Sequence, residues 1–149
     1  IRSAMHRTNI LQAVEKHRQG AISGRFLRSE LPAHRSLIDR LSLHRVLHYH
    51  EGCVNRLAWN ETGSKLASVS DDCSLVIWDA ALSKQVDKVF TGHNQNVFAV
   101  KFIPETGDRQ IVTGAMDSQV RLHTLNEGAV DTLVFRCHRD RVKDVEVES

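Results

Sequence analysis

The feature that most constrains this chain is a unit of about 43 residues that occurs more than once. His93 follows His50 by 43 residues and His138 follows His93 by 45, and a valine stands four positions after each histidine. Short apolar runs separated by turns that contain Gly or Asp fill each unit, which is typical of strands in tight hairpins. A single small sheet of such strands cannot bury both of its apolar faces. The repeat therefore predicts small sheets stacked face to face in an all-β fold.

The first unit predicts four strands, over residues 54–59, 66–69, 75–78 and 84–90. The last of these alternates polar with apolar residues, as a strand with one solvent-exposed side does. The second unit repeats the pattern in register, because residues 111–117 parallel 66–72 and residues 120–123 parallel 75–78. A third unit starts at His138, and the sequence stops within its first expected strand.

The layout of the first unit, from His50 to the pair Trp78-Asp79, resembles a WD40 repeat, the four-stranded unit of a β-propeller blade. The resemblance implies a partial WD40 propeller, with blade 1 at about residues 53–90, blade 2 at about 96–136 and the start of blade 3 at about 140–149. A closed propeller has about four to eight blades, so the chain is expected to be a fragment of a longer protein. Assembly of several copies into one ring is the alternative.

In WD40 proteins the resemblance implies a hydrogen-bonded chain of Asp, His, a hydroxyl and Trp that ties each blade together. In the first unit this assigns the residues Asp72, His50, Ser70 and Trp78. The chemistry is consistent, because the carboxylate, the imidazole, the hydroxyl and the indole N–H then satisfy one another when they are buried.

The second unit departs from this pattern. His93 and Asp117 remain, but Ala115 stands at the expected hydroxyl position and His123 at the tryptophan position. Only the first link of the chain, between His93 and Asp117, is therefore expected there, and the second blade is predicted to be less tightly specified.

Charge is concentrated in the first 49 residues, which carry nine Lys or Arg against three acidic residues. Because the whole chain has a net charge of +2, the remaining residues carry a net charge of −4. We interpret residues 1–42 as a basic, helical arm that precedes the propeller residues 43–149. A solvated arm is the simplest interpretation of the charge, and contact with nucleic acid phosphates is the alternative, although no aromatic platform or recognised reading motif accompanies it.

Residues 8–20 of the arm predict one short helix. Thr8 or Asn9 can cap its start, cations occupy its last turn, and Gly20 can take the left-handed conformation after its end. A helix of about ten residues is marginal alone in water. It therefore needs a surface to dock against, either the flank of the propeller or another protein.

Two further elements are predicted between this helix and the first repeat. Residues 36–41 form a helical turn with Leu37, Ile38 and Leu41 on one side, and residues 43–49 alternate as a strand. In a propeller such a strand is the outermost one of the last blade and closes the ring, so closure would depend on blades beyond this chain.

The order of these segments is similar to the N-terminal part of the WD-and-tetratricopeptide-repeat (adipose) family, which belongs to the cullin-4-associated factors. The similarity rests on Ile38-Asp39-Arg40-Leu41, on residues 50–60, and on Gly92-His93, residues 98–102 and residues 107–109, and it extends from about Asn9 onward. It implies a substrate receptor of a cullin-4 RING ubiquitin ligase, working in the nucleus or the cytoplasm. The N-terminal helix would insert into the ligase's damaged-DNA-binding adaptor protein, and the propeller would hold a protein substrate.

The adaptor-binding residues that this resemblance implies are Ile10, Leu11, Val14 and Arg18, with Leu37, Ile38 and Leu41 as a second contact. One departure is that many such receptors carry an arginine two places after the Trp-Asp pair, whereas Ala80-Ala81 follows that pair here. The alternative function is a WD40 scaffold in a chromatin or RNA-processing assembly, with the basic arm on nucleic acid.

An enzyme is the further alternative, because Ser70, His50 and Asp72 are the residue types of a hydrolase triad. No G-x-S-x-G turn exposes the serine, and the parallel position in the second unit is Ala115. A structural network accounts for all three residues, so the prediction is a non-enzymatic scaffold with no catalytic residues.

No metal or other cofactor is predicted. His44, His48 and His50 could be considered as ligands, but no single secondary structure brings all three to one side. The three cysteines show no C-x-x-C spacing, which favours reduced thiols in an intracellular protein. No apolar run of about 18 residues is present, so nothing directs the chain into a membrane.

Overall fold

The computed structural model describes residues 16–21, 24, 39 and 41–147, and the chain divides into two units, residues 1–44 and 45–149. In the first unit residues 16–18 are helical, and Gly20 follows with a φ of 74°. The Gly20 N–H donates to the carbonyl of His17 at 2.9 Å and the Ala21 N–H to that of Lys16 at 2.8 Å. This pair of bonds is a common way for a helix to end at a left-handed glycine. Gly20 thus has the conformation predicted for it, while residues 8–15 of the predicted helix lie outside the described residues.

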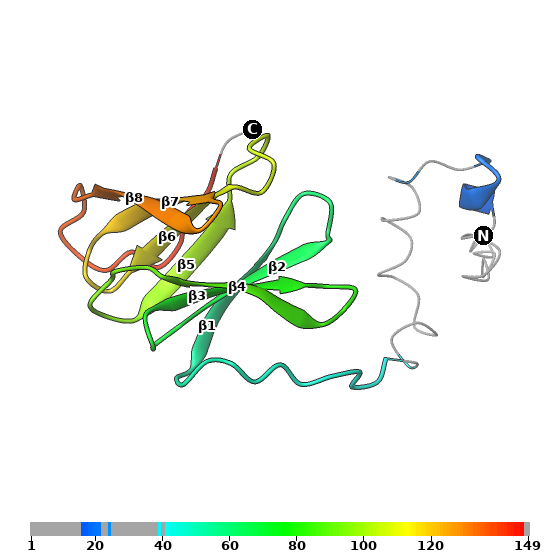
Figure 1. The fold of residues 1–149 in the computed structure, drawn as a ribbon, viewed down its shortest axis with the longest axis horizontal. Helices are drawn as coiled ribbons and strands as arrows, with labels where there is room; N and C mark the ends of the chain where they lie inside the picture. Colours follow the sequence, from blue (N-terminus) through cyan, green and yellow to red (C-terminus); the bar gives the residue numbers. More distant parts are fainter. Residues whose placement is uncertain (1–15, 22–23, 25–38, 40, 148–149) are drawn as a thin grey trace, which may run out of the picture. The chain divides into compact units, whose positions relative to one another are not determined.

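The second unit contains eight strands in two antiparallel sheets of four, which is the predicted partial propeller (Figure 1). Blade 1 consists of β1 (Val54–Trp59), β2 (Lys65–Ser70), β3 (Ser74–Asp79) and β4 (Lys84–Phe90). Blade 2 consists of β5 (Val97–Phe102), β6 (Gln110–Ala115), β7 (Val120–Asn126) and β8 (Ala129–Phe135). In each sheet the strands lie in sequence order, so every connection within a blade is a hairpin.

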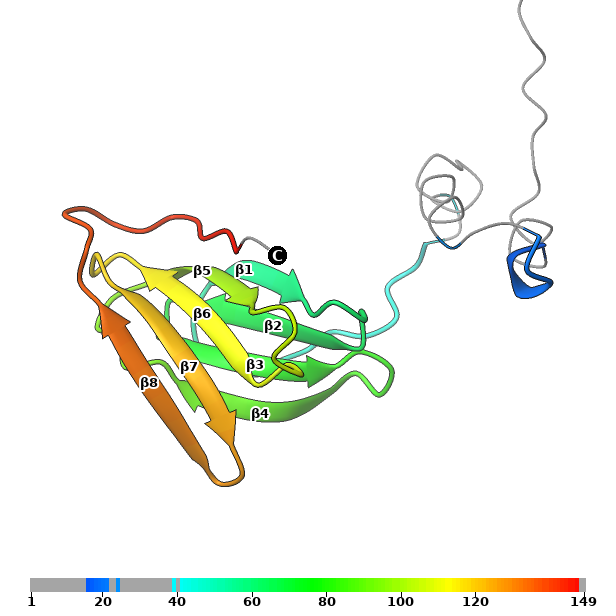
Figure 2. The same ribbon diagram turned by 90° about the horizontal axis from the view of Figure 1, so that it is seen from above.

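The blades pack face to face, as the two apolar faces of each sheet require (Figure 2). The shared core joins one face of blade 1 to one face of blade 2, and β1 and β2 lie against β5. Burying one valine, leucine or isoleucine side chain contributes about 1.5–3 kcal/mol, so this interface is the main source of stability between the blades. Its residues are Ala58, Ala67, Val69, Leu75, Ile77 and Val89 from blade 1 and Val97, Val100, Phe102, Ile111 and Ala115 from blade 2.

Two asparagine side chains connect the blades at opposite ends of the innermost strand of blade 1. Near the start of β1, the Asn55 amide donates to the carbonyl of Val97, the first residue of β5, at 3.0 Å. Just after the end of β1, the Asn60 amide donates to a carboxylate oxygen of Asp108 at 2.9 Å, and Lys65 pairs with the same carboxylate at 3.3 Å. The contact between the sheets is therefore held by hydrogen bonds at both ends as well as by its apolar centre.

The other face of blade 1 has the same apolar pattern but is covered only in part, since Val76 and Trp78 are buried there while the residues of its innermost strand are not. Val100 and Phe102 of blade 2 are 1% and 8% exposed where they pack against blade 1. Their counterparts one repeat earlier, Leu57 and Trp59, are 57% and 58% exposed. Because equivalent residues face the same way in a repeat protein, Leu57 and Trp59 form a blade-docking face without a neighbouring sheet.

The prediction of a strand over residues 43–49 is wrong for this structure, since residues 41–50 form no strand. A strand needs a hydrogen-bonded neighbour, and none of the described strands pairs with this segment. Residues 45–49 lie against blade 1 through side chains instead. Arg45 donates to the carbonyl of Leu82 at 3.3 Å, and the Tyr49 ring meets the edge of Trp78 with 6.2 Å between the centroids.

The third repeat also forms no strand over its described residues 140–147. Its course is nevertheless that of an inner strand beside β5. The Val142 N–H donates to the carbonyl of Ala115 at 2.9 Å, Asp144 pairs with Arg56, and Glu146 pairs with Lys101 at 3.1 Å. A pocket of about 410 Å³ remains between this segment and the apolar outer face of blade 2.

Candidate functional site

Each blade contains a buried chain of hydrogen bonds that starts at a carboxylate and a histidine. In blade 1, His50 Nδ1 lies 3.1 Å from a carboxylate oxygen of Asp72, and His50 Nε2 lies 2.8 Å from Ser68 Oγ. The indole N–H of Trp78, on β3, donates to the same Ser68 oxygen at 2.9 Å. Since an indole N–H can only donate, Ser68 accepts from Trp78, and its own hydrogen has a closer acceptor in His50 Nε2 than in the Val76 carbonyl at 3.5 Å. His50 then donates from Nδ1 to Asp72.

The hydroxyl in this chain is Ser68, so the assignment of Ser70 is wrong. Both serines are on β2, two residues apart, and therefore on the same face of the strand. The strand register decides between them, because Ser68 is the residue opposite Leu57 and Val76 and within reach of the Trp78 ring. Ser70 is buried at the end of β2 and accepts a hydrogen bond from the Asp72 N–H at 3.3 Å, which supports the turn that follows.

Asp72 is held as a carboxylate by several donors. Burial alone raises its pKa, but hydrogen bonds from the side chain and the N–H of Ser74, from the Glu51 N–H and from His50 outweigh burial and hold the pKa of Asp72 well below its usual value. The Ser74 hydroxyl lies 2.7 Å from the carboxylate and the Glu51 N–H 3.0 Å. The acidic end of the blade 1 chain is therefore ionised at neutral pH.

Blade 2 contains a longer chain, although only its first link was predicted. His93 Nδ1 lies 2.9 Å from Asp117, and His93 Nε2 lies 2.9 Å from the hydroxyl of Thr113 on β6. Thr113 is also 2.9 Å from His123 Nε2, and His123 Nδ1 is 3.1 Å from the hydroxyl of Thr132 on β8. Thr113 and His123 thus take the places of Ser68 and Trp78, and the chain continues to the outer strand.

The sequence contains a signal for this chain of hydrogen bonds. Ser68 and Thr113 are equivalent positions of the two repeats, and both carry a hydroxyl, whereas Ser70 aligns with Ala115. A histidine at position 123 also keeps a ring N–H where the indole N–H of Trp78 is. Comparing the hydroxyl positions of both units, instead of one unit alone, would have identified Ser68 and Thr113.

The donor and acceptor of each hydrogen bond in the blade 2 chain follow from the residues at its two ends. Burial raises the pKa of Asp117, but hydrogen bonds from His93 and from the Gln119 and Asn94 N–H groups lower it below its usual value, so Asp117 accepts. His93 then donates from Nδ1 and accepts from Thr113 at Nε2, and Thr113 accepts from His123 Nε2–H. His123 Nδ1 is left as the acceptor for Thr132. Both histidines are therefore neutral.

Burial supports the neutral state of both rings. It lowers the pKa of His93, against the opposing effect of Asp117, and it lowers the pKa of His123 from 6.5 to about 4. The Arg121 guanidinium acts in the same direction on His123, as a positive charge on the His93 ring would. A positive charge on either ring would be costly because both side chains are buried.

Arg121, on β7, connects blade 2 to the loop that leaves blade 1. Its Nη1 donates to the carbonyl of Thr91 and its Nη2 to Gln119 Oε1, both at 2.9 Å. A Cβ added to Gly92 would lie 2.2 Å from Arg121 Nη1, and Gly92 has a φ of 73°. The loop therefore favours a glycine for its backbone conformation, and an added Cβ would displace the guanidinium from its bonds to Thr91 and Gln119.

The substitution Gly92→Ala is expected to lower the free energy of unfolding by about 2 kcal/mol, because it combines a left-handed backbone with a clash. Gly63→Ala is the matched control, since Gly63 has a φ of 72° but nothing within 4 Å of an added Cβ. The control should cost only the backbone conformation, about 1 kcal/mol. Urea unfolding of both variants measures the difference, and equal losses would contradict the role given to Arg121.

The two chains of hydrogen bonds are suited to holding strands together and not to attacking a substrate. Ser68 and Thr113 are buried, and each oxygen already accepts from one ring and donates to another. A serine nucleophile needs an exposed oxygen and a nearby oxyanion site. The catalytic residue types at this site are therefore explained by buried hydrogen bonding.

Among the described residues, no group of three or more His, Cys, Asp or Glu side chains is placed to hold a metal ion. Cys53, Cys73 and Cys137 form no disulfide bond with one another. Within the same part of the chain, no helix is long and apolar enough to cross a membrane.

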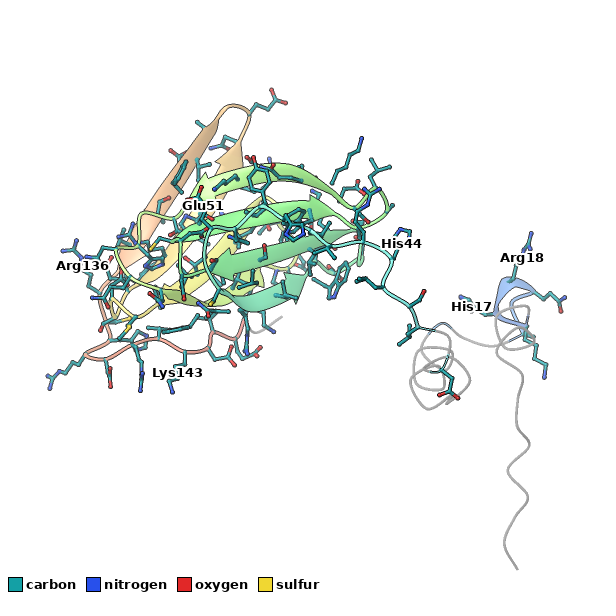
Figure 3. All side chains as sticks on the ribbon, turned by 90° about the horizontal axis from the view of Figure 1, so that it is seen from below. His17, Arg18, His44, Glu51, Arg136 and Lys143 are labelled. Carbon is teal, nitrogen blue, oxygen red and sulfur yellow. The ribbon has the colours of Figure 1, made fainter. Side chains whose placement is uncertain are left out.

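Of the predicted adaptor-binding residues, the structure describes two. Arg18 is exposed on the helical turn (Figure 3), and Leu41 is 72% exposed. The remaining five, Ile10, Leu11, Val14, Leu37 and Ile38, lie outside the described residues.

Comparison with known proteins agrees with this architecture. A family model described as "WD domain, G-beta repeat" matches residues 41–79 and 84–124. A solved structure of U3-55K superposes with a TM-score of 0.57 at 19% sequence identity, covering 65% of this chain and 30% of that one, which supports the fold alone.

Three relatives are more similar in sequence. The human WD and tetratricopeptide repeats protein 1 is 46% identical over 109 residues, which is 72% of this chain and 16% of that protein. Protein ALTERED SEED GERMINATION 2 of Arabidopsis thaliana is 41% identical, over 77% of this chain and 16% of that protein. The human DDB1- and CUL4-associated factor 6 is 36% identical, over 87% of this chain and 15% of that protein. The chain spans about a sixth of the length of these relatives, and with its two repeats matched in register it belongs to the WD40-repeat family.

Proposed function

We propose that this chain is part of a substrate receptor of a cullin-4 RING ubiquitin ligase, which docks on the ligase adaptor through its N-terminal helix. A WD40 propeller is a scaffold for protein interactions, and the finer assignment is supported by a relative whose name states an association with DDB1 and CUL4. In this proposal residues 1–42 are the docking arm, residues 43–149 contribute blades to a propeller that holds a protein substrate, and the protein works in the nucleus or the cytoplasm.

The observation that carries the proposal is the extent of the similarity to that relative. The unit from residue 45 onward makes up about 70% of the chain, yet the similarity to DDB1- and CUL4-associated factor 6 covers 87% of it. The match therefore includes part of the arm as well as the repeats. An arm that only linked two domains would have less reason to retain similarity.

The arm has features of a docking helix. A helical turn closes at Gly20 with two backbone hydrogen bonds, which defines where the helix ends. Ile10, Leu11 and Val14 are the apolar residues of the preceding segment, at the spacing of one helical face. An amphipathic helix in a groove of a partner is a common mode of recognition, and we propose Arg18 as a polar contact at the edge of that groove.

The proposal is tested by capturing the purified ligase adaptor with the full-length protein. The variant Leu11→Asp with Val14→Asp is expected to lose most of the binding, because burying two carboxylates in an apolar groove is unfavourable. The matched control is Leu82→Asp with Val86→Asp, which changes the same residue types on the exposed surface of blade 1. The control should bind as the wild type does, and all three proteins should unfold at the same temperature.

A wild-type protein that does not bind the adaptor would remove the receptor assignment. The charge of the first 49 residues would then favour the alternative, a chromatin or RNA-processing scaffold with the arm on nucleic acid. Binding to nucleic acid that weakens steeply with salt would support that alternative, since each phosphate contact releases a counterion.

A further inference from the structure

Four cationic side chains occur close together on the segment that follows β8. They are Arg136, Arg139, Arg141 and Lys143, and all four are exposed. Residues 136–143, the basic segment, contain four basic residues and one acidic residue, whereas the rest of residues 50–149 contain seven basic and fourteen acidic residues. Figure 3 shows Arg136 and Lys143 on this segment. The repeats thus carry one strongly basic stretch on a unit that is otherwise acidic.

The four cations have no anionic partner among the residues that the structure describes. The acidic residues nearest to them in the sequence are already engaged. Asp144 pairs with Arg56 of β1, and the carboxylate of Asp140 accepts the backbone N–H of Arg141 at 2.7 Å. The cations of the basic segment are therefore available to an anion from another molecule.

Comparison with the second repeat indicates that this stretch stays accessible when a blade is complete. Arg139 and Arg141 take the places of Asn94 and Asn96 in the second repeat. Asn94 is exposed and Asn96 is half-buried, although all four strands of blade 2 are present. Equivalent residues face the same way in a repeat protein, so we expect Arg139 and Arg141 to lie on the surface of a longer protein as well.

An exposed apolar side chain adjoins the basic segment. The Val142 N–H donates to the carbonyl of Ala115 at 2.9 Å, so Arg141 and Met116 are on neighbouring stretches of the chain. Met116 is 45% exposed, whereas its equivalent in blade 1 is the charged residue Asp71. A methionine side chain is flexible and packs against apolar groups of many shapes. This surface therefore combines cations with an adaptable apolar contact.

The cations are spread along the segment. Arg141 and Lys143 flank the buried Val142, so their side chains leave the chain on the side away from it. Residues two apart in an extended chain are separated by about 6–7 Å, and alternate residues of an extended partner have the same separation. A row of separate cations suits several carboxylates, whereas a single phosphate group is bound best by donors that converge on it.

Nucleic acid fits this surface less well than an acidic protein segment does. A nucleic acid strand carries a phosphate at every nucleotide, so beyond the basic segment it would continue over repeats with an excess of acidic residues. At the positions of blade 1 that match Arg139 and Met116 it would meet Glu51 and Asp71. A protein segment can carry its charges at one end only and place an apolar side chain next to them.

We propose that the basic segment, together with Met116, binds an acidic segment of a partner protein in an extended conformation. Carboxylates at alternate positions pair with Arg141 and Lys143, further acidic residues pair with Arg136 and Arg139, and a neighbouring apolar side chain rests on Met116. This partner is held whether or not the arm docks on a ligase adaptor, so the two proposals are tested separately.

The test uses the full-length protein and a fluorescein-labelled peptide of repeated Glu-Leu-Glu-Ser, with binding measured by fluorescence anisotropy. The same peptide with glutamine in place of glutamate is expected to bind at least about tenfold more weakly, and salt should weaken the glutamate peptide. Lys143→Glu should weaken the glutamate peptide about fivefold, because it replaces an attraction by a repulsion. Met116→Ser should weaken it about threefold through the lost apolar contact.

Lys84→Glu is the matched control, because Lys84 is also an exposed lysine without an anionic partner in the described chain and the change in net charge is the same. Arg7→Glu makes the same change in the arm. Both controls should bind the glutamate peptide as the wild type does.

The inference is overturned if the wild type binds the two peptides equally, or if either control costs as much affinity as Lys143→Glu. It is also overturned if a single-stranded oligonucleotide of the same charge binds more tightly than the glutamate peptide and loses its affinity in Lys143→Glu, since the basic segment would then be a nucleic acid site.

Discussion

Replacing Ser68 with alanine is expected to lower the free energy of unfolding by about 3 kcal/mol. The substitution removes the oxygen between His50 and Trp78 and leaves the imidazole Nε2 and the indole N–H without partners. Ser68 is 2% exposed, so water cannot readily replace the hydroxyl. A buried polar group without a hydrogen bond costs about 1–3 kcal/mol, and two such groups are created here. Urea unfolding followed by tryptophan fluorescence measures the loss.

Ser70→Ala is the matched control for this prediction. Ser70 is on the same strand and face and is also buried, but its hydroxyl makes one longer bond, to the Asp72 N–H at 3.3 Å. The same change should therefore cost about 1 kcal/mol. A loss at Ser70 that equals or exceeds the loss at Ser68 would mean that the hydrogen-bonded chain does not run through Ser68.

Replacing Val100 with aspartate is expected to destabilise the chain by more than about 4 kcal/mol. Val100 is 1% exposed in the core between the blades, where a carboxylate would have no cationic partner. Burying an unpaired charge is among the few changes with so large an effect. The expected result is that the two blades no longer unfold together, which calorimetry or two-probe urea unfolding would detect.

Leu57→Asp is the matched change one repeat earlier and has two expected results. In the 149-residue chain Leu57 is 57% exposed, so the change should cost less than about 1 kcal/mol. In a longer protein whose other blades cover this face, the same change should be about as damaging as Val100→Asp. Equal, small effects in both proteins would mean that this face of blade 1 is not covered by another blade.

The repeat made most of the fold predictable. Residue spacing alone placed the hairpins, because an apolar run between turns has few alternatives to a short strand. The strand over residues 43–49 was not predictable in the same way. Its alternating pattern suits a strand, but pairing depends on a neighbour, and among the described strands it has none.

The site was predictable by residue type but not by position. Strand alternation places Ser68 and Ser70 on the same face, so only the register with β1 and β3 decides which hydroxyl meets the histidine. In blade 2 the family pattern predicted a broken chain, because Ala115 is at the expected hydroxyl position and His123 is not a tryptophan. What the position requires is a ring N–H aimed at a hydroxyl, and an imidazole supplies one.

The two asparagines between the blades have a consequence for ring size. When wedge-shaped units close into a circle, the angle between neighbours determines how many units fit. Asn55 and Asn60 fix the separation of the two sheets at both ends of β1, through Val97 and Asp108. A change at one end alone would tilt one wedge against the next and alter the curvature of the whole ring. The blade number of a propeller can thus depend on side-chain amides that form hydrogen bonds from one blade to the next.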